Sequence, residues 1–211
     1  MCAVTEQVLW SPSDNELVCR VGSGQATYHR FDPRSRQHQI TYGTRMIEAK
    51  HHPETANGWL SGREIQQREY FDGQLSPLNL LAHTCCHEFA HLLQHNAGQR
   101  YRGSVHNRHF YRILDDLHTS GQADASRQAL ADLAVEQGIA LSDAWFELPD
   151  PINSRAHWNV GDTVSFSTRT RELQGEIRRV NRKTCTVHGT GACRGVRYRV
   201  PVQLLRKVSA S

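Results

Sequence analysis

The sequence lacks any long hydrophobic run. No segment approaches the roughly 18 consecutive apolar residues that are needed to cross a bilayer. The first ten residues, MCAVTEQVLW, also lack the basic stretch followed by an apolar one that marks a secretory signal. We therefore expect a protein that is neither secreted nor inserted in a membrane.

Cysteine is sparse as well, with six residues scattered along 211 positions. A chain of this length can bury a core that is stable without disulfide bonds. Cys85 and Cys86 are adjacent within an apolar pattern of helical period, where small buried thiols are usual. This use of cysteine favours reduced thiols and a cytoplasmic location.

Acidic residues are scarce toward the C-terminus. Residues 159–211 contain 11 lysines and arginines and three acidic residues, a net charge of +8, whereas residues 1–158 carry a net charge of −4. Such asymmetry predicts an anionic partner, with DNA or another nucleic acid as the first candidate, and a solvated basic surface as the alternative. The side chains that could contact phosphates are Arg169, Arg171, Arg178, Arg179, Arg182, Lys183, Arg194, Arg197 and Arg199.

The spacing of hydrophobic residues predicts an α+β protein. Residues 26–47 are rich in aromatic and β-branched residues on both sides of the turn sequence FDPRSR, which indicates a hairpin. Residues 48–73, which have turn residues at both ends, are expected to contain at most one short strand. Apolar residues then recur at helical spacing, and three helices are expected within residues 74–98, 104–118 and 124–138.

Prolines at 149 and 151 interrupt regular structure and suggest a linker at residues 151–158. The linker would separate a first domain, residues 1–150, from a second domain, residues 159–211. The second domain contains five short stretches of strand-forming residues, divided by glycine or charged turns. This pattern predicts a small all-β barrel.

Four histidines lie four residues apart in the stretch HTCCHEFAHLLQH: His83, His87, His91 and His95. On an α-helix each step of four residues rises about 6 Å, so two neighbours in this row can share one ion but three cannot. Only His87 is followed directly by a carboxylate, Glu88, which makes HEFAH an HExxH motif. We therefore expect His87 and His91 to bind the metal and the other two histidines to be its neighbours.

The HExxH motif has a defined chemistry. Two neutral imidazoles bind zinc, and the glutamate, about 100° round the helix, reaches a water on the open face of the ion. The metal lowers the pKa of that water, and the glutamate takes its proton. Glu88 is thus the predicted catalytic base of a zinc-dependent hydrolysis of peptide bonds.

A catalytic zinc site needs a third protein ligand. Gln94 and Ala97 stand where a metzincin would have glycine and histidine, so that arrangement is excluded. His106 follows His91 by fifteen residues, beyond the loop NAGQRYRGSV, and Phe110 follows four residues later.

These residues resemble the SprT-like zinc metalloproteases, whose pattern is HExxH, a loop of this length, and a histidine with phenylalanine four residues on. The resemblance covers roughly residues 38–118. It implies a zincin-like domain, built from a small sheet and the HExxH helix, with His106 as the third zinc ligand and His109 as the alternative. It also implies an endopeptidase that acts on proteins bound or crosslinked to DNA. Asn107 stands where the family usually has glycine, a mild change because asparagine tolerates a left-handed conformation.

The last 50 residues resemble an SH3-like or KOW-type barrel, which would replace the zinc ribbon with paired CxxC motifs that many SprT-like proteins carry. Such barrels occur in nucleic-acid and protein binding alike. Around a glycine turn, Cys185, His188 and Cys193 are candidate ligands for a second metal, and a plain hairpin is the alternative.

Two other functions fit the same residues. One is a nucleic-acid-binding adaptor with a structural zinc site, and the other is a zinc protease with no nucleic-acid role. Glu88 favours an enzyme over the adaptor, because a structural site is more often closed by a fourth protein ligand and needs no base. For a peptidase, the segment HQITYGTRMI is the expected edge strand for pairing with the substrate backbone.

Overall fold

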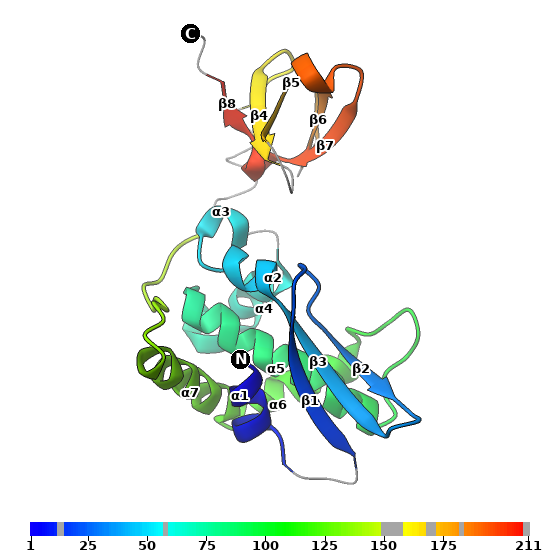
Figure 1. The fold of residues 1–211 in the computed structure, drawn as a ribbon, viewed down its shortest axis with the longest axis vertical. Coiled ribbons are helices and arrows are strands. Elements are labelled where there is room, and N and C mark those ends of the chain that lie inside the picture. Colours follow the sequence, from blue (N-terminus) through cyan, green and yellow to red (C-terminus); the bar gives the residue numbers. More distant parts are fainter. Residues whose placement is uncertain (12–14, 57–58, 149–157, 168–171, 182–183, 209–211) are drawn as a thin grey trace. The chain divides into compact units, whose positions relative to one another are not determined.

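A computed structural model of the chain describes residues 1–11, 15–56, 59–148, 158–167, 172–181 and 184–208 (Figure 1). Most of the predicted linker therefore lies outside the described residues. The chain divides into two compact units, Met1–His52 with Gly58–Glu147, and Pro53–Asn57 with Leu148–Ser211. The fold class is α+β, as predicted.

The first unit contains a mixed three-stranded sheet with the strand order β1-β3-β2. The strands are β1 (Glu16–Gly22), β2 (Tyr28–Asp32) and β3 (Gln37–Gly43). The predicted hairpin is confirmed, because β2 and β3 pair antiparallel; β1, which pairs parallel with β3, was not predicted. The prediction that HQITYGTRMI forms an edge strand is wrong. Its first part is the central strand β3, and Thr44 begins a helix.

Helices make up the rest of the first unit. The three predicted helices are present as α5, α6 and α7. Helix α4 was not predicted, and it is important for the site described below. The helical segments of the described chain before the second sheet are α1 (Cys2–Val4), η1 (Thr5–Leu9), α2 (Thr44–Ala49), α3 (Pro53–Ala56, grouped with the second unit), α4 (Leu60–Arg68), η2 (Tyr70–Gly73), α5 (Pro77–Asn96), α6 (Arg108–Thr119) and α7 (Gln122–Glu136). Among the described residues, no helix combines the length and the hydropathy of a bilayer-spanning segment.

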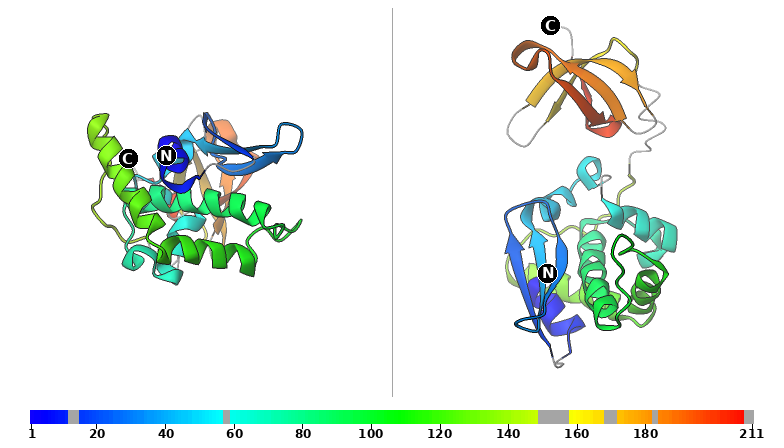
Figure 2. Two further views of the ribbon diagram at one scale, coloured as in Figure 1. Left: turned by 90° about the horizontal axis from the view of Figure 1, so that it is seen from below. Right: turned by 90° about the vertical axis from the view of Figure 1, so that its right-hand side faces the viewer.

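Helix α5 is the centre of the first unit. Its start is fixed by Ser76, whose side-chain oxygen accepts a hydrogen bond from the backbone N–H of Asn79 at 3.1 Å, and by Pro77 at the first helical position. The helix packs against β2 and β3 on one side and against α6 and α7 on the other (Figures 1 and 2). Because both sides are covered, most of its residues are buried, including all but one of the residues from 77 to 92. Polar side chains on α5 are therefore held in a packed environment.

The second unit is an antiparallel five-stranded sheet with the order β7-β6-β5-β4-β8. The five predicted strands are confirmed. Over the described residues, however, no pairing joins β7 to β8, so the sheet is not closed into the predicted barrel. Its own hydrophobic core includes Val164, Ile177 and Val187. The elements are β4 (Thr163–Ser167), β5 (Glu172–Val180), β6 (Thr184–Gly189), η3 (Gly191–Cys193), β7 (Arg197–Pro201), η4 (Val202–Leu204) and β8 (Arg206–Lys207).

Candidate metal centre

Three histidines of the first unit direct their ring nitrogens to one point. His87 and His91 are one helical turn apart on α5, and their ring centroids are 5.0 Å apart. Nε2 of His106 lies 3.2 Å from Nε2 of His87 and 3.1 Å from Nε2 of His91. The ligand atoms of the three residues all lie within 4.8 Å of one another. The structure thus brings together the three predicted metal ligands.

The loop that carries His106 is tied to α5 by a side-chain amide. Nε2 of Gln94 donates to the backbone oxygen of Val105 at 2.9 Å and to Oδ1 of Asn107 at 3.1 Å. Oδ1 of Asn107 also accepts from the backbone N–H groups of His109 and Phe110, at 2.9 and 3.1 Å. Asn107 has an extended backbone, with φ −90° and ψ −178°, and serves as the N-cap of α6, so its tolerance of a left-handed conformation is not used here.

Phe110 forms a wall behind the three imidazoles. Its side chain is fully buried, and its ring centroid lies 4.9 Å from those of His87 and His106 and 4.4 Å from that of His91. The position four residues after His106 places this ring on the first turn of α6. Phe110 therefore limits the rotation of the three side chains.

The tautomer of His87 is fixed by Glu64, a residue that the sequence did not reveal. Glu64 belongs to α4 and is 3% exposed, and its Oε2 accepts hydrogen bonds from Nδ1 of His87 and Nε2 of His83, both at 2.9 Å. Burial alone would raise the pKa of Glu64, but these two hydrogen bonds lower it overall, so the carboxyl is ionised. Since a carboxylate only accepts, Nδ1 of His87 carries the hydrogen and its Nε2 presents a lone pair.

The same holds for His91. Its Nδ1 faces Oε1 of Gln94 at 3.5 Å, an acceptor, which leaves the lone pair on Nε2. Burial and then the neighbouring His87 and His106 lower the pKa of His91 to about 2, and burial followed by His87 lowers the pKa of His106. Both residues are therefore neutral, the form in which imidazole binds a metal.

These tautomers provide a test of whether a metal fits. Two lone pairs, on Nε2 of His87 and of His91, face Nε2 of His106, which can donate one hydrogen at most. Hydrogen bonding among the three rings therefore leaves at least one lone pair without a donor. A cation at the centre satisfies all three nitrogens. Three neutral imidazoles suit zinc, which takes three protein ligands in catalytic sites and keeps one position open.

Glu88 lies at the edge of this centre. The residue is 5% exposed, and its Oε2 is buried without a hydrogen-bond partner among the described residues. Burial raises the pKa of Glu88, whereas His87, Lys50 and Arg100 oppose the rise, as does a hydrogen bond from the backbone of His29 on β2. An unpartnered buried carboxylate oxygen is costly unless a further group occupies its site.

A cavity of about 190 Å³ opens beside the imidazoles and Glu88. Lys50 lines this cavity, and its Nζ donates hydrogen bonds to side-chain oxygens of Ser61 and Thr84 and to the backbone oxygen of Leu80. The cavity is large enough for a substrate side chain of moderate size, in contact with the candidate centre. It is lined by Thr27, Met46, Lys50, Trp59, Leu60, Ser61, Thr84, His87, Glu88 and His106.

A second group of potential metal ligands lies directly behind the first. Glu64, His83 and His87 are mutually close enough to hold an ion. Each contact between them is accounted for by a hydrogen bond to the Glu64 carboxylate, and Nδ1 of His83 accepts a further one from Nε2 of His118 at 3.1 Å. Burial lowers the pKa of His83 to about 4, so this residue is neutral. We interpret the second group as the support of the first, since such hydrogen bonds orient metal-binding imidazoles.

His95 and His109 belong to neither group of potential ligands in the described part of the chain. His95 packs against Phe31 of β2, with ring centroids 4.6 Å apart. His109 approaches Tyr101, at 6.4 Å between centroids. The structure therefore brings His106, and not the alternative His109, to the HExxH pair.

The structure does not support a second metal at the candidate ligands Cys185, His188 and Cys193. Among the described residues these three do not form a ligand group. Cys185 is buried in the core of the second unit, and Sγ of Cys193 donates to the backbone oxygens of Gln174 at 3.2 Å and Thr190 at 3.1 Å. The alternative, a hairpin held by a glycine turn, describes this segment.

Five of the nine basic residues predicted to contact phosphates are described, and all five are exposed on the second unit. Arg169, Arg171, Arg182 and Lys183 lie outside the described residues. The five are Arg178, Arg179, Arg194, Arg197 and Arg199.

Comparison of the chain with protein-family models, with curated proteins and with solved structures finds no match. The resemblance to the SprT-like proteases therefore stays a prediction, and the functional argument depends on the geometry of His87, His91, His106 and Glu88.

Proposed function

We propose that the first unit is a zinc-dependent endopeptidase of the SprT-like, zincin-like type. The observation that carries the proposal is the convergence of three Nε2 lone-pair positions beside the buried, unpartnered oxygen of Glu88. When bound, zinc would polarise the scissile carbonyl and lower the pKa of a water molecule. His87, His91 and His106 would hold it.

The remaining chemistry falls to residues of the chain. Glu88 is the base that accepts the proton of the attacking water and later passes it to the leaving amine. Its burial favours this role, because a raised pKa makes a carboxylate a better proton acceptor near neutral pH. Glu64 keeps the ring of His87 in the tautomer that leaves Nε2 free.

Strand β2 is the best candidate for binding the substrate backbone. It is an edge strand, and it packs against α5 with His29 next to Glu88. A peptide that pairs with an edge strand uses main-chain groups, which gives broad sequence preference. We infer from the family resemblance that the substrates are proteins bound or crosslinked to DNA, and that the second unit is a variant of the SH3-like or KOW-type barrel.

The test is a cleavage assay on a DNA-bound protein, with zinc content measured on the same samples. Glu88→Gln should retain zinc and lose at least about 100-fold in rate, since general-base catalysis contributes roughly 10²–10⁴-fold. His106→Ala should lose zinc, while His109→Ala, a matched change three residues away, should keep both zinc and activity. Equal cleavage by wild type and Glu88→Gln at equal zinc content would contradict the proposed peptidase activity. It would favour the nucleic-acid-binding adaptor with a structural zinc site.

A further inference from the structure

A cavity of about 240 Å³ lies on the second unit, on the sheet face opposite its hydrophobic core. Glu176 of β5, His188 of β6 and Arg197 of β7 are cross-strand neighbours on this face. Residues that alternate with them, such as Ile177 and Val187, are buried in the core. The strand register thus determines which residues lie on this face of the sheet.

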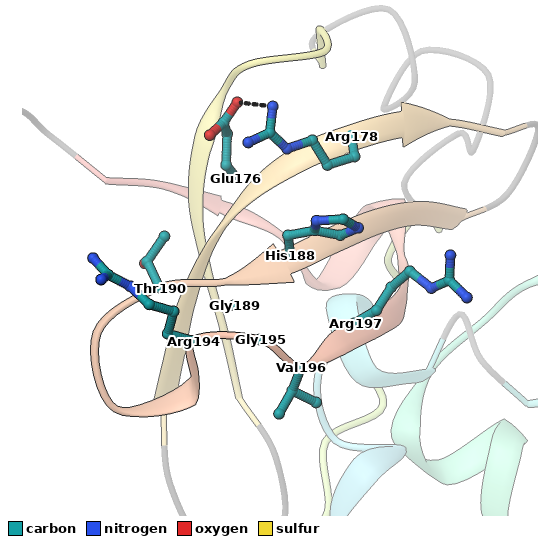
Figure 3. A pocket seen from close by; sticks show the side chains of 9 residues that line it. All are labelled: Glu176, Arg178, His188, Gly189, Thr190, Arg194, Gly195, Val196 and Arg197. Atoms are coloured by element: carbon teal, nitrogen blue, oxygen red, sulfur yellow. Dashed lines mark ion pairs between the residues drawn. The ribbon is translucent and has the colours of Figure 1, made fainter.

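The face is cationic. Arg178, Arg194 and Arg197 line the cavity and are exposed, and Glu176 is the one acidic residue among the lining residues (Figure 3). Glu176 is already engaged, because its Oε1 lies 3.0 Å from Nη1 of Arg178. In the part of the chain that the structure describes, neither Arg194 nor Arg197 forms a salt bridge with a carboxylate. Two guanidinium groups are therefore available to an external anion.

The arginines do not converge on one point. Figure 3 shows Arg194 at one end of the cavity and Arg197 at the other, with the ring of His188 between them. One compact anion could not contact both guanidinium groups in this arrangement. An extended anion with charges at regular intervals could contact both.

The turn that carries Arg194 is closely packed. A Cβ atom on Gly189 would lie 2.3 Å from the backbone oxygen of Cys193, so the two backbone segments are packed as closely as glycine allows. Gly191 and Gly195 adopt positive φ angles of 58° and 87°. The single hydrogen of the Cys193 thiol is shared between the backbone oxygens of Gln174 and Thr190, and together these features fix the backbone that carries Arg194.

We infer that this cationic face, formed by Arg178, His188, Arg194 and Arg197, binds the phosphodiester backbone of a nucleic acid. No phenylalanine, tyrosine or tryptophan lines the cavity, so binding depends mainly on contacts with phosphates and not on sequence. The net charge of +8 over residues 159–211 strengthens the attraction. The biological use of this face, to bring the peptidase to protein on nucleic acid, rests on the proposed function.

The test measures binding of a labelled 20-nucleotide DNA single strand to the full chain at several salt concentrations. All proteins carry Glu88→Gln, so that no result depends on proteolysis. Replacing both Arg194 and Arg197 with alanine should lower the slope of log K against log salt by about 1.4, and the affinity at 0.15 M salt about tenfold. The matched control, Arg206→Ala with Lys207→Ala, removes the same charge from β8, which among the described strands pairs with β4 at the far edge of the sheet from β7. This control should change the affinity no more than about twofold.

Equal losses in the two double variants would overturn the inference, because they would show that net charge and not this face governs binding. Competition by polyglutamate that equals competition by an oligonucleotide of the same charge would also overturn it and assign the face to acidic proteins. Single-stranded RNA and duplex DNA serve as further probes that identify the source of the phosphodiester. If the chain binds DNA as predicted but cleaves no protein, the inference about the cationic face holds and the proposed peptidase function is wrong.

Discussion

Replacement of Glu64 by glutamine perturbs the metal centre without touching a ligand. In the native structure Oε2 of Glu64 accepts hydrogen bonds from His87 and His83, both at 2.9 Å, and its Oε1 is buried without a hydrogen-bond partner among the described residues. A glutamine can place its oxygen at the Oε2 position, which puts a buried NH₂ group where the native Oε1 has no hydrogen-bond partner among the described residues. Alternatively it can place the NH₂ group there, where it faces two N–H donors.

Either orientation costs about 1–3 kcal/mol, because a buried polar group is left unsatisfied. It also weakens the control of the His87 tautomer. Loss of such a supporting group typically lowers metal affinity 10- to 100-fold. We therefore expect Glu64→Gln to bind zinc about 10- to 100-fold more weakly than the wild type, with a further loss of stability in the metal-free protein.

The measurement is zinc affinity by competition with a chelator of known affinity, together with urea unfolding of the metal-free forms. Glu64→Asp tests the geometry, since it keeps the charge but shortens the reach across α4 to α5. An unchanged zinc affinity in Glu64→Gln would refute the account of Glu64 as the group that orients His87. Complete loss of zinc from Glu64→Gln, with zinc retained in His91→Ala and His106→Ala, would place the ion between Glu64, His83 and His87 instead.

Three further predictions concern stability. Burial lowers the pKa of Lys50 to about 7, so between about pH 7 and pH 10 the folded state binds fewer protons than the unfolded state, and the free energy of unfolding should rise with pH. Urea unfolding across this range should show a flatter profile for Lys50→Met, and parallel profiles would contradict the burial argument. Phe110→Ala should cost about 3–5 kcal/mol and reduce zinc affinity, as measured by unfolding and chelator competition, because it removes the wall behind three imidazoles. Gly189→Ala should destabilise the second unit by about 1–3 kcal/mol, whereas Gly195→Asn, where a Cβ meets open space, should cost less than half as much by thermal unfolding.

Sequence patterns predicted the long helix and the His87–His91 pair because the signals are local, whereas His106, fifteen residues beyond His91, was expected from the family resemblance. Ser76, Pro77 and the apolar spacing define α5, and the HExxH pair lies within a single turn. The hairpin likewise follows from two β-rich stretches around one turn. Each of these features can be inferred from residues that are close in the chain.

Helix α4 and Glu64 escaped prediction because the buried face of that helix is not apolar. Its buried residues are Ser61, Gly62, Glu64 and Ile65, so hydrophobic spacing gives almost no helical signal. Contacts between Glu64 and α5, or between His83 and His118, join residues 19 to 35 positions apart and depend on tertiary packing.

Asn107 and β1 show two other limits of prediction from the sequence. Asn107 was compared with a glycine and interpreted through its tolerance of positive φ, although asparagine directly before a helix is equally a capping signal. Strand β1 (Glu16–Gly22) alternates between exposed and partly buried residues without a strong apolar face, and its parallel partner β3 lies about 20 residues later. Parallel pairing of this kind leaves no turn signature in the sequence.

The central claim is that His87, His91 and His106 hold a catalytic zinc ion with one open position. The most direct test is anomalous diffraction at the zinc edge from crystals of the zinc-loaded protein. The account predicts one strong peak about 2.0–2.1 Å from Nε2 of each of the three histidines, with no fourth protein ligand. A peak between Glu64 and His83, or a fourth protein ligand at the three-histidine centre, would contradict it.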